Sequence, residues 1–289
     1  MGTPEPTRGY AATPWPPRRV AGLARSCHPG PVIAVSVTAG GLGAAGGLDG
    51  ARWVLLVAAV LTGQLSVGWC NDAFDARRDA AAGRTGKPVA EGAVSRRAVW
   101  AAAFTAALLC VPLSLACGPQ AGAVHLAAVA AAWAYNLKLK ATVLSWLPYV
   151  IGFGTLPAVA TLTLPGRPWP AWWAVTAGAL LGLAAHLGDV LPDIEDDLRH
   201  GVTGLPQRLG ATATRLLLPV PLVAASAVLA FGPAGPPGRW GAVTLAVAAP
   251  AAVAGLVLAR TWRKAPLAAA AVVAAADVAL LLVRGTGPA

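Results

Sequence analysis

The stretch Asn71–Ala93 reads NDAFDARRDAAAGRTGKPVAEGA, and the stretch Asp189–Ala211 reads DVLPDIEDDLRHGVTGLPQRLGA. The two align without a gap at a constant offset of 118 residues, with eight identities in 23 positions. Coincidence in a chain rich in Gly and Ala is the alternative, but the identities are clustered. We interpret the pair as an internal repeat, which membrane folds often contain. The identical pairs include Asp75 with Asp193, Asp79 with Asp197, and Pro88 with Pro206.

Both stretches lie between long apolar segments, in a chain that is poor in charge. Of 289 residues, 12% are charged and 56% are hydrophobic, and the mean hydropathy is +0.63. A soluble domain has about 25% charged residues, and it could not cover its surface with so few. The composition therefore predicts a polytopic membrane protein and excludes a disordered chain, a disulfide scaffold and a soluble enzyme. The apolar runs are unbroken, whereas the strands of a β-barrel would alternate.

The apolar segments predict membrane-spanning helices, because lipid offers no partner for backbone polar groups. The offset of the repeat corresponds to four such segments. We expect an all-α integral membrane protein with nine transmembrane helices, arranged as two four-helix repeats and one extra helix. The nine segments are Val32–Leu48, Trp53–Cys70, Ala98–Cys117, Ala121–Tyr135, Val143–Leu164, Ala171–Leu187, Leu216–Phe231, Trp240–Ala259 and Leu267–Val283.

The basic residues predict the orientation. With nine spans and a cytoplasmic N-terminus, 18 of the 22 Lys and Arg residues lie on the cytoplasmic side, as expected for a multi-pass protein of the plasma membrane in a bacterium. Because they lie in short segments between spans, the net charge of +10 does not indicate nucleic acid. We expect residues 1–31, rich in Pro and Arg, to form a flexible cytoplasmic segment that contacts anionic lipid, and residues 32–289 to form the transmembrane domain.

Ten of the twelve acidic residues also lie on the cytoplasmic side, most of them in the two repeated stretches. Each stretch carries polar groups at i, i+4 and i+8, which share one face of a helix. Like charges so placed repel, and a bound cation removes that penalty. Mg²⁺ suits oxygen ligands and substrate phosphates, whereas two solvated acidic loops are the simpler alternative. The candidate metal-ligating and catalytic residues are Asn71, Asp75, Asp79, Asp189, Asp193 and Asp197.

These residues resemble the motifs of the UbiA superfamily of intramembrane prenyltransferases. The first motif of that family, NDxxDxxxD, is complete from Asn71 to Asp79, including Asp72. The second is similar to the three aspartates from Asp189 to Asp197, followed by the LPQRLG tail at 205–210. A tyrosine with a basic cluster, here Tyr135, Lys138 and Lys140, also matches.

The resemblance implies a helical barrel around an apolar cavity, capped by the two loops. It implies that Mg²⁺ holds a prenyl diphosphate, which ionises to an allylic cation that alkylates a lipophilic acceptor. The second loop departs from the family pattern, because Val202 and Leu205 stand where the first loop has Arg84 and Lys87. We therefore expect the substrate to be bound by Asp72, Arg84, Lys87, Tyr135, Lys138 and Lys140.

Two other functions remain open from the sequence. An intramembrane terpene cyclase would ionise the same diphosphate without an acceptor. A transporter fits less well, because its site would lie near the middle of the bilayer, whereas these acids lie at one surface. Four polar residues within or at the ends of spans have open roles, each being either structural or part of the site: Gln64, His125, His186 and Asp277.

Overall fold

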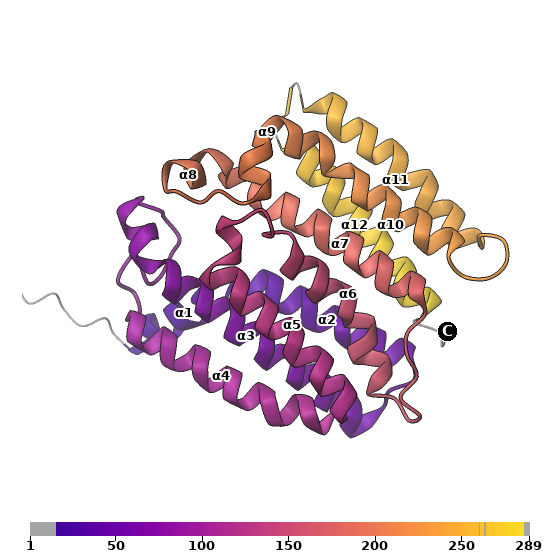
Figure 1. Cartoon of the computed structure of the whole chain (residues 1–289), viewed down its shortest axis with the longest axis horizontal. Helices are drawn as coiled ribbons and strands as arrows, with labels where there is room; N and C mark the ends of the chain where they lie inside the picture. The colour runs from indigo at the N-terminus through magenta and orange to yellow at the C-terminus, as the bar shows by residue number, and fades with distance from the viewer. Residues whose placement is uncertain (1–15, 260, 263, 286–289) are drawn as a thin grey trace, which may run out of the picture.

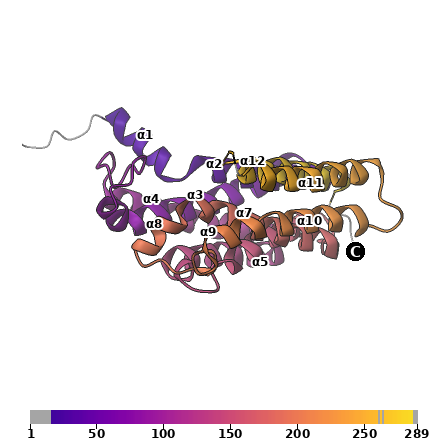
Figure 2. The same cartoon turned by 90° about the horizontal axis from the view of Figure 1, so that it is seen from above.

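The computed structural model describes residues 16–259, 261, 262 and 264–285, and its regular elements are helices. The long helices run side by side, with α8 and the α3–α4 connection at one end and the α10–α11 connection at the other (Figure 1). Seen from above, α1 lies at the edge of the bundle beyond α2 (Figure 2). The helices are α1 Pro16–Ser26, α2 Pro29–Ala45, α3 Gly50–Ala81, α4 Arg96–Ala116, α5 Pro119–Leu137, α6 Leu147–Leu162, α7 Trp172–Val190, α8 Ile194–Arg199, α9 Leu205–Leu217, α10 Pro219–Phe231, α11 Arg239–Leu258 and α12 Ala265–Arg284, with 3₁₀ turns η1 Leu139–Ala141 and η2 Leu191–Asp193.

The predicted all-α membrane fold agrees with these helices, and each of the nine apolar segments coincides with one of them. The number of membrane crossings stays a prediction. Within the described residues, five helices are long and apolar enough to span a bilayer, or six if the bent pair α9 and α10 forms one span. Helices α2 and α6 are apolar but shorter, with 17 and 16 residues. Of the predicted N-terminal segment, residues 1–15 lie outside the described residues, and Pro16–Ser26 is helical.

The repeat is visible in the helices, since α6 begins 118 residues after α2. The two motif-bearing helices differ, however. Helix α3 continues without a break from Gly50 to Ala81 and carries the whole first motif. Helix α7 ends at Val190, and the chain passes through η2 into α8. The expectation that the second motif occupies one face of one helix is therefore wrong, because Pro192 lacks the N–H that a continuing helix requires.

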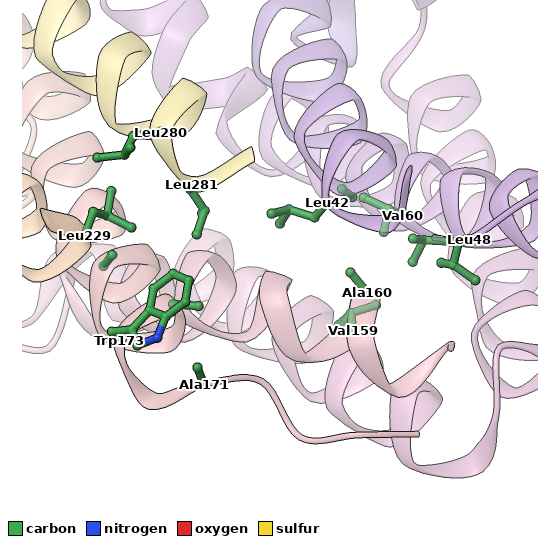
Figure 3. Packing of buried hydrophobic residues seen from close by; sticks show 14 residues of the cluster. Leu42, Leu48, Val60, Val159, Ala160, Ala171, Trp173, Leu229, Leu280 and Leu281 are labelled. Atoms are coloured by element: carbon green, nitrogen blue, oxygen red, sulfur yellow. The ribbon is translucent and has the colours of Figure 1, made fainter. Parts of the chain in front are cut away.

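The end of the bundle away from the two motifs is closed by a hydrophobic core (Figure 3). Leu42 of α2 and Val60 of α3 lie opposite Val159 of α6, and all three are at most 2% exposed. Trp173 of α7 packs with Leu229 of α10 and the α12 residues Leu280 and Leu281 in the same cluster. Within the bundle, α6 and α7 approach so closely that a Cβ at Gly182 would overlap the Tyr149 carbonyl oxygen. Such small residues are typical of helix contacts in membranes.

Candidate active site

A cavity of about 1020 Å³ lies inside the bundle. Its volume is at the upper end of the range of ligand-binding pockets, about 300–1000 Å³. Toward the motif end it is lined by charged and polar side chains, and deeper in the bundle by apolar ones. The polar lining includes Asn71, Asp75, Arg78, Arg84, Lys87, Tyr135, Asn136, Lys140, Tyr149, Asp189, Asp193, Asp197 and Gln207.

The first motif places its side chains on successive turns of α3. Asp75 is 6% exposed and accepts hydrogen bonds from Lys140 Nζ and, at 3.0 Å, from Arg78 Nη2. Asn71 donates to the side-chain oxygen of Asn136 on α5 at 3.1 Å. Helix α5 and the turn that follows it therefore fix two of the three ligand candidates on α3.

The second motif is held by side chains from two other helices, α6 and α9. The hydroxyl of Tyr149, in α6, donates to Asp189 Oδ2 at 2.7 Å. Gln207, in α9, donates to Asp197 Oδ2 at 2.9 Å. Asp193 is exposed to the cavity that it lines. Because α7 breaks between these carboxylates, partners outside α7 set their positions.

Arg84 joins the two motifs directly. Its Nη1 lies 3.5 Å from Asp79 Oδ1, and its Nη2 lies 2.7 Å from Asp196 Oδ2 and 3.2 Å from Asp197 Oδ1. Burial of the guanidinium opposes its charge, but the hydrogen bond to Asp196 and the surrounding carboxylates raise the pKa of Arg84 above its ordinary value. The loop after α3 and helix α8 are thus connected through one cation.

Two lysines complete the basic lining. Lys87 Nζ lies 3.5 Å from Asp72 Oδ1 and 3.9 Å from Asp79 Oδ2. Burial lowers the pKa of Lys140 below its ordinary value, although the charge of Asp75 opposes the change. Because the ammonium group is already partly desolvated by burial, its interaction with an anion that enters the cavity is less screened than it would be in water.

The structure brings together most of the predicted site residues. Nine of them line the cavity: Asn71, Asp75, Arg84, Lys87, Tyr135, Lys140, Asp189, Asp193 and Asp197. Asp72 and Asp79 are buried beside it, each 1% exposed, behind Lys87 and Arg84. Lys138 is exposed at the end of α5 and does not line this cavity.

Sequence reasoning missed three residues that hold the site, Arg78, Asn136 and Gln207, and it missed the hydrogen bond from Tyr149 to Asp189. Gln207 lies inside the LPQRLG tail and Arg78 inside the first motif, so both were within reach of the pattern. Asn136 is adjacent to the matched Tyr135. Tyr149 contacts Asp189 across 40 positions of sequence, and no spacing rule connects the two.

The donor atoms that line the cavity are of the type that a magnesium ion prefers. Asn71, Asp75, Asp189 and Asp193 offer carboxylate and amide oxygens to one cavity, and Mg²⁺ prefers oxygen ligands with substrate phosphates completing its shell. In the part of the chain that the structure describes, no three His, Cys, Asp or Glu side chains already converge on one point. Asp72 and Asp79 are buried beside the cavity, where their carboxylates pair with the side chains of Lys87 and Arg84 at 3.5 Å.

A helical membrane bundle with an interior cavity and an acidic and basic mouth defines a class of intramembrane enzymes. The model of the UbiA prenyltransferase family matches residues 32–281, and the chain belongs to this family. The predicted family, and with it the prediction of an enzyme of the prenyltransferase class, is confirmed.

Three relatives of known name or structure are similar to this chain. A digeranylgeranylglyceryl phosphate synthase from Methanoregula boonei is 30% identical over 171 residues, which cover 57% of this chain and 59% of that protein. A UbiA homologue from Archaeoglobus fulgidus, bound to GPP and Mg²⁺, superposes with a TM-score of 0.70 at 14% identity, covering 91% of this chain and 99% of the other. A UbiA homologue from Aeropyrum pernix gives 0.69 at 19% identity, covering 88% and 98%. At these identities the two structures establish the fold.

Proposed function

We propose that this chain transfers a prenyl group from a prenyl diphosphate to a lipophilic acceptor inside the membrane, through an allylic carbocation. One observation carries the proposal: a single cavity of about 1020 Å³ has carboxylates and cations at one end and apolar side chains along its depth. That division matches a substrate with a charged head and a hydrocarbon tail. The A. fulgidus homologue bound to GPP and Mg²⁺ supports the same substrate class.

The acidic residues of the two motifs would hold Mg²⁺ with the diphosphate. The candidates are Asn71, Asp75, Asp79, Asp189, Asp193 and Asp197, of which all but Asp79 line the cavity. When bound, Mg²⁺ supplies Lewis-acid stabilisation of the charge on the leaving diphosphate. Because substrate phosphates usually provide part of its shell, the protein needs to offer only a few oxygens.

The basic residues would stabilise the leaving group. Arg84, Lys87 and Lys140 line the mouth of the cavity and are already oriented by carboxylates. Donors fixed in advance toward developing negative charge cost no reorganisation when the bond breaks. Asp72 would act by holding Lys87. Lys138, exposed at the end of α5, would meet the diphosphate only as it enters.

The remaining walls would protect the carbocation. Tyr135 and Tyr149 line the cavity with their rings edge to face at 5.2 Å, and aromatic faces stabilise cations. The apolar lining excludes water from the cation. The acceptor has to enter from the bilayer, so it is lipophilic, in keeping with the name of the M. boonei relative. We propose that the motif loops and the N-terminus face the cytoplasm.

The test uses the purified full chain in lipid nanodiscs, with Mg²⁺, a series of prenyl diphosphates and a lipid extract. We expect a prenylated lipid by mass spectrometry together with diphosphate release. Asp75→Asn and Asp193→Asn each reduce both signals at least 100-fold, whereas Asp49→Asn, the same change at the opposite end of α3, does not. Full activity in either motif variant overturns the proposal.

Two other outcomes would replace the proposed function with a different one. A cyclic terpene formed from the diphosphate alone would replace transfer by cyclisation. Movement of substrate across vesicle membranes without release of diphosphate would replace an enzyme function by transport.

A further inference from the structure

Two polar side chains line the apolar part of the cavity, away from the acidic loops. Gln64 of α3 and His125 of α5 both line it, among Val60 and Val129. Gln64 precedes Asn71 by seven residues, which places it about 10 Å deeper along α3. Neither side chain takes part in the network around the aspartates, so neither is explained by diphosphate binding.

The hydrogen bonds around His125 determine which ring nitrogen carries the proton. Ser114 Oγ donates its only proton to the Cys110 carbonyl oxygen at 2.6 Å. The same oxygen lies 2.8 Å from His125 Nδ1, so Nδ1 must be the donor in that contact. A neutral imidazole protonated on Nδ1 presents a lone pair at Nε2.

Among the residues that the structure describes, none donates a hydrogen bond to His125 Nε2. His125 is 4% exposed, and its contacts with the described residues are made through Nδ1. The other edge of its ring faces α3, where a Cβ at Gly63 would lie 3.1 Å from Nε2. The amide of Gln64, the next residue, also has no hydrogen-bond partner in the described part of the chain. Both side chains line the cavity, so the lone pair of Nε2 is available there to a ligand that supplies the missing donor.

We propose that His125 and Gln64 bind a hydroxyl group of the lipophilic acceptor. The hydroxyl proton is donated to His125 Nε2, and the hydroxyl oxygen accepts from the Gln64 amide. A ketone or ether has no proton for Nε2, and an ionised group finds no cation at this depth among the residues that line the cavity. The inference rests on the proposed function, because it assigns this cavity to the acceptor as well as to the prenyl diphosphate.

A binding experiment tests it without catalysis. The probes are 4-heptylphenol and its methyl ether, which differ in the hydroxyl proton, and binding is followed by the thermal shift of the purified protein without Mg²⁺ or diphosphate. We expect the phenol to bind at least 10-fold more tightly than the ether in the wild type. His125→Leu and Gln64→Leu should each bring the two affinities to within about 3-fold of each other.

Thr155→Val is the matched control. Thr155 also lines the cavity, but its hydroxyl already donates to the Ile151 carbonyl oxygen at 2.7 Å. We expect this variant to keep the preference for the phenol. Equal binding of the two probes by the wild type overturns the inference, as does a wild-type preference in both Leu variants or loss of the preference in Thr155→Val.

Failure of the hydroxyl-binding site and failure of the proposed prenyl transfer give different results. If the chain prenylates lipids but binds both probes equally, only the hydroxyl site is wrong. If it prefers the phenol but forms no prenylated product, the site stands as a hydroxyl-binding site and the proposed function fails. Two variants on different helices keep the test valid if one of them does not fold.

Discussion

Ser145 is a single hydroxyl that connects three parts of the chain. Its oxygen accepts from the Leu205 backbone N–H at 3.0 Å, so its own proton is free to be donated to His186 Nε2 at 3.1 Å. His186 is buried and packs against Tyr149, with the ring centroids 4.9 Å apart. Since Tyr149 donates a hydrogen bond to Asp189, we predict that His186 is a positioning residue for the second motif.

We expect Ser145→Ala to destabilise the protein by about 1–3 kcal/mol, because it leaves the Leu205 N–H and His186 Nε2 unpaired. Thermal unfolding in detergent, followed by tryptophan fluorescence, measures the change. Ser36→Ala is the matched control, since Ser36 Oγ is buried and has no hydrogen-bond partner within the described part of the chain, and its loss should be neutral or stabilising. An equal effect of the two substitutions would contradict the role of Ser145.

At this scale the sequence predicted the motif residues and their cationic partners Arg84, Lys87 and Lys140, but it missed amide partners such as Asn136 and Gln207. The pattern from Asn71 to Asp79 identified side chains that do line the cavity or support its lining. It did not separate Lys138 from Lys140. Helix α5 ends at Leu137 and η1 follows, so that Lys138 is exposed while Lys140 reaches Asp75. A turn of this kind is set by tertiary contacts, which spacing in the sequence does not encode.

At the scale of elements, the two copies of the repeat have diverged. At the offset of 118 residues, Phe74 in the middle of the first motif corresponds to Pro192 in the second. The first motif is therefore a continuous helix, while the second is broken into η2 and α8. The alignment contained this signal, since proline inside a helix removes a hydrogen bond. Which side chains then hold the broken segment was not readable from the alignment.

The joint between α1 and α2 packs tightly on α3. Trp69 donates to the Leu23 carbonyl oxygen at 2.9 Å, and a Cβ at Gly68 would overlap the Cys27 carbonyl oxygen. We expect Gly68→Ala to force the joint away from α3 and cost about 1–3 kcal/mol or more. Gly30→Ala, where a Cβ would meet nothing within 4 Å, should be close to neutral. Thermal unfolding of both variants measures the difference in stability. Similar stabilities would contradict tight packing of the joint on α3.

At the scale of the whole molecule, the two motifs come from opposite halves of the sequence and meet at one mouth. We expect Mg²⁺ with a non-reactive prenyl thiolodiphosphate to stabilise the folded protein by about 2.7 kcal/mol when the ligand is at 100 times its Kd. The analogue without Mg²⁺, after chelation with EDTA, should give little stabilisation. The double variant Asp75→Asn, Asp193→Asn should not respond. An undiminished thermal shift in EDTA would argue against metal-dependent binding.

The meeting of the two motifs could be predicted from the sequence, because an even number of predicted spans between the copies would put both on the same side of the membrane. The count of nine crossings stays a prediction, and it depends on short apolar helices such as α2 and α6. Their length alone does not decide whether they cross. The side of the membrane that each connection faces is therefore the informative measurement.

Accessibility to a membrane-impermeant maleimide measures that side. The native cysteines Cys27, Cys70, Cys110 and Cys117 are buried, so an introduced cysteine is the main target. In right-side-out vesicles we expect Ala234→Cys, exposed in the connection between α10 and α11, to be labelled directly. Thr85→Cys, exposed in the first motif loop, should be labelled only after the membrane is opened. Basic residues are retained on the cytoplasmic side, and this loop carries Arg84 and Lys87. Labelling of both sites in sealed vesicles, or the reverse order, would contradict the orientation with the active site in the cytoplasm.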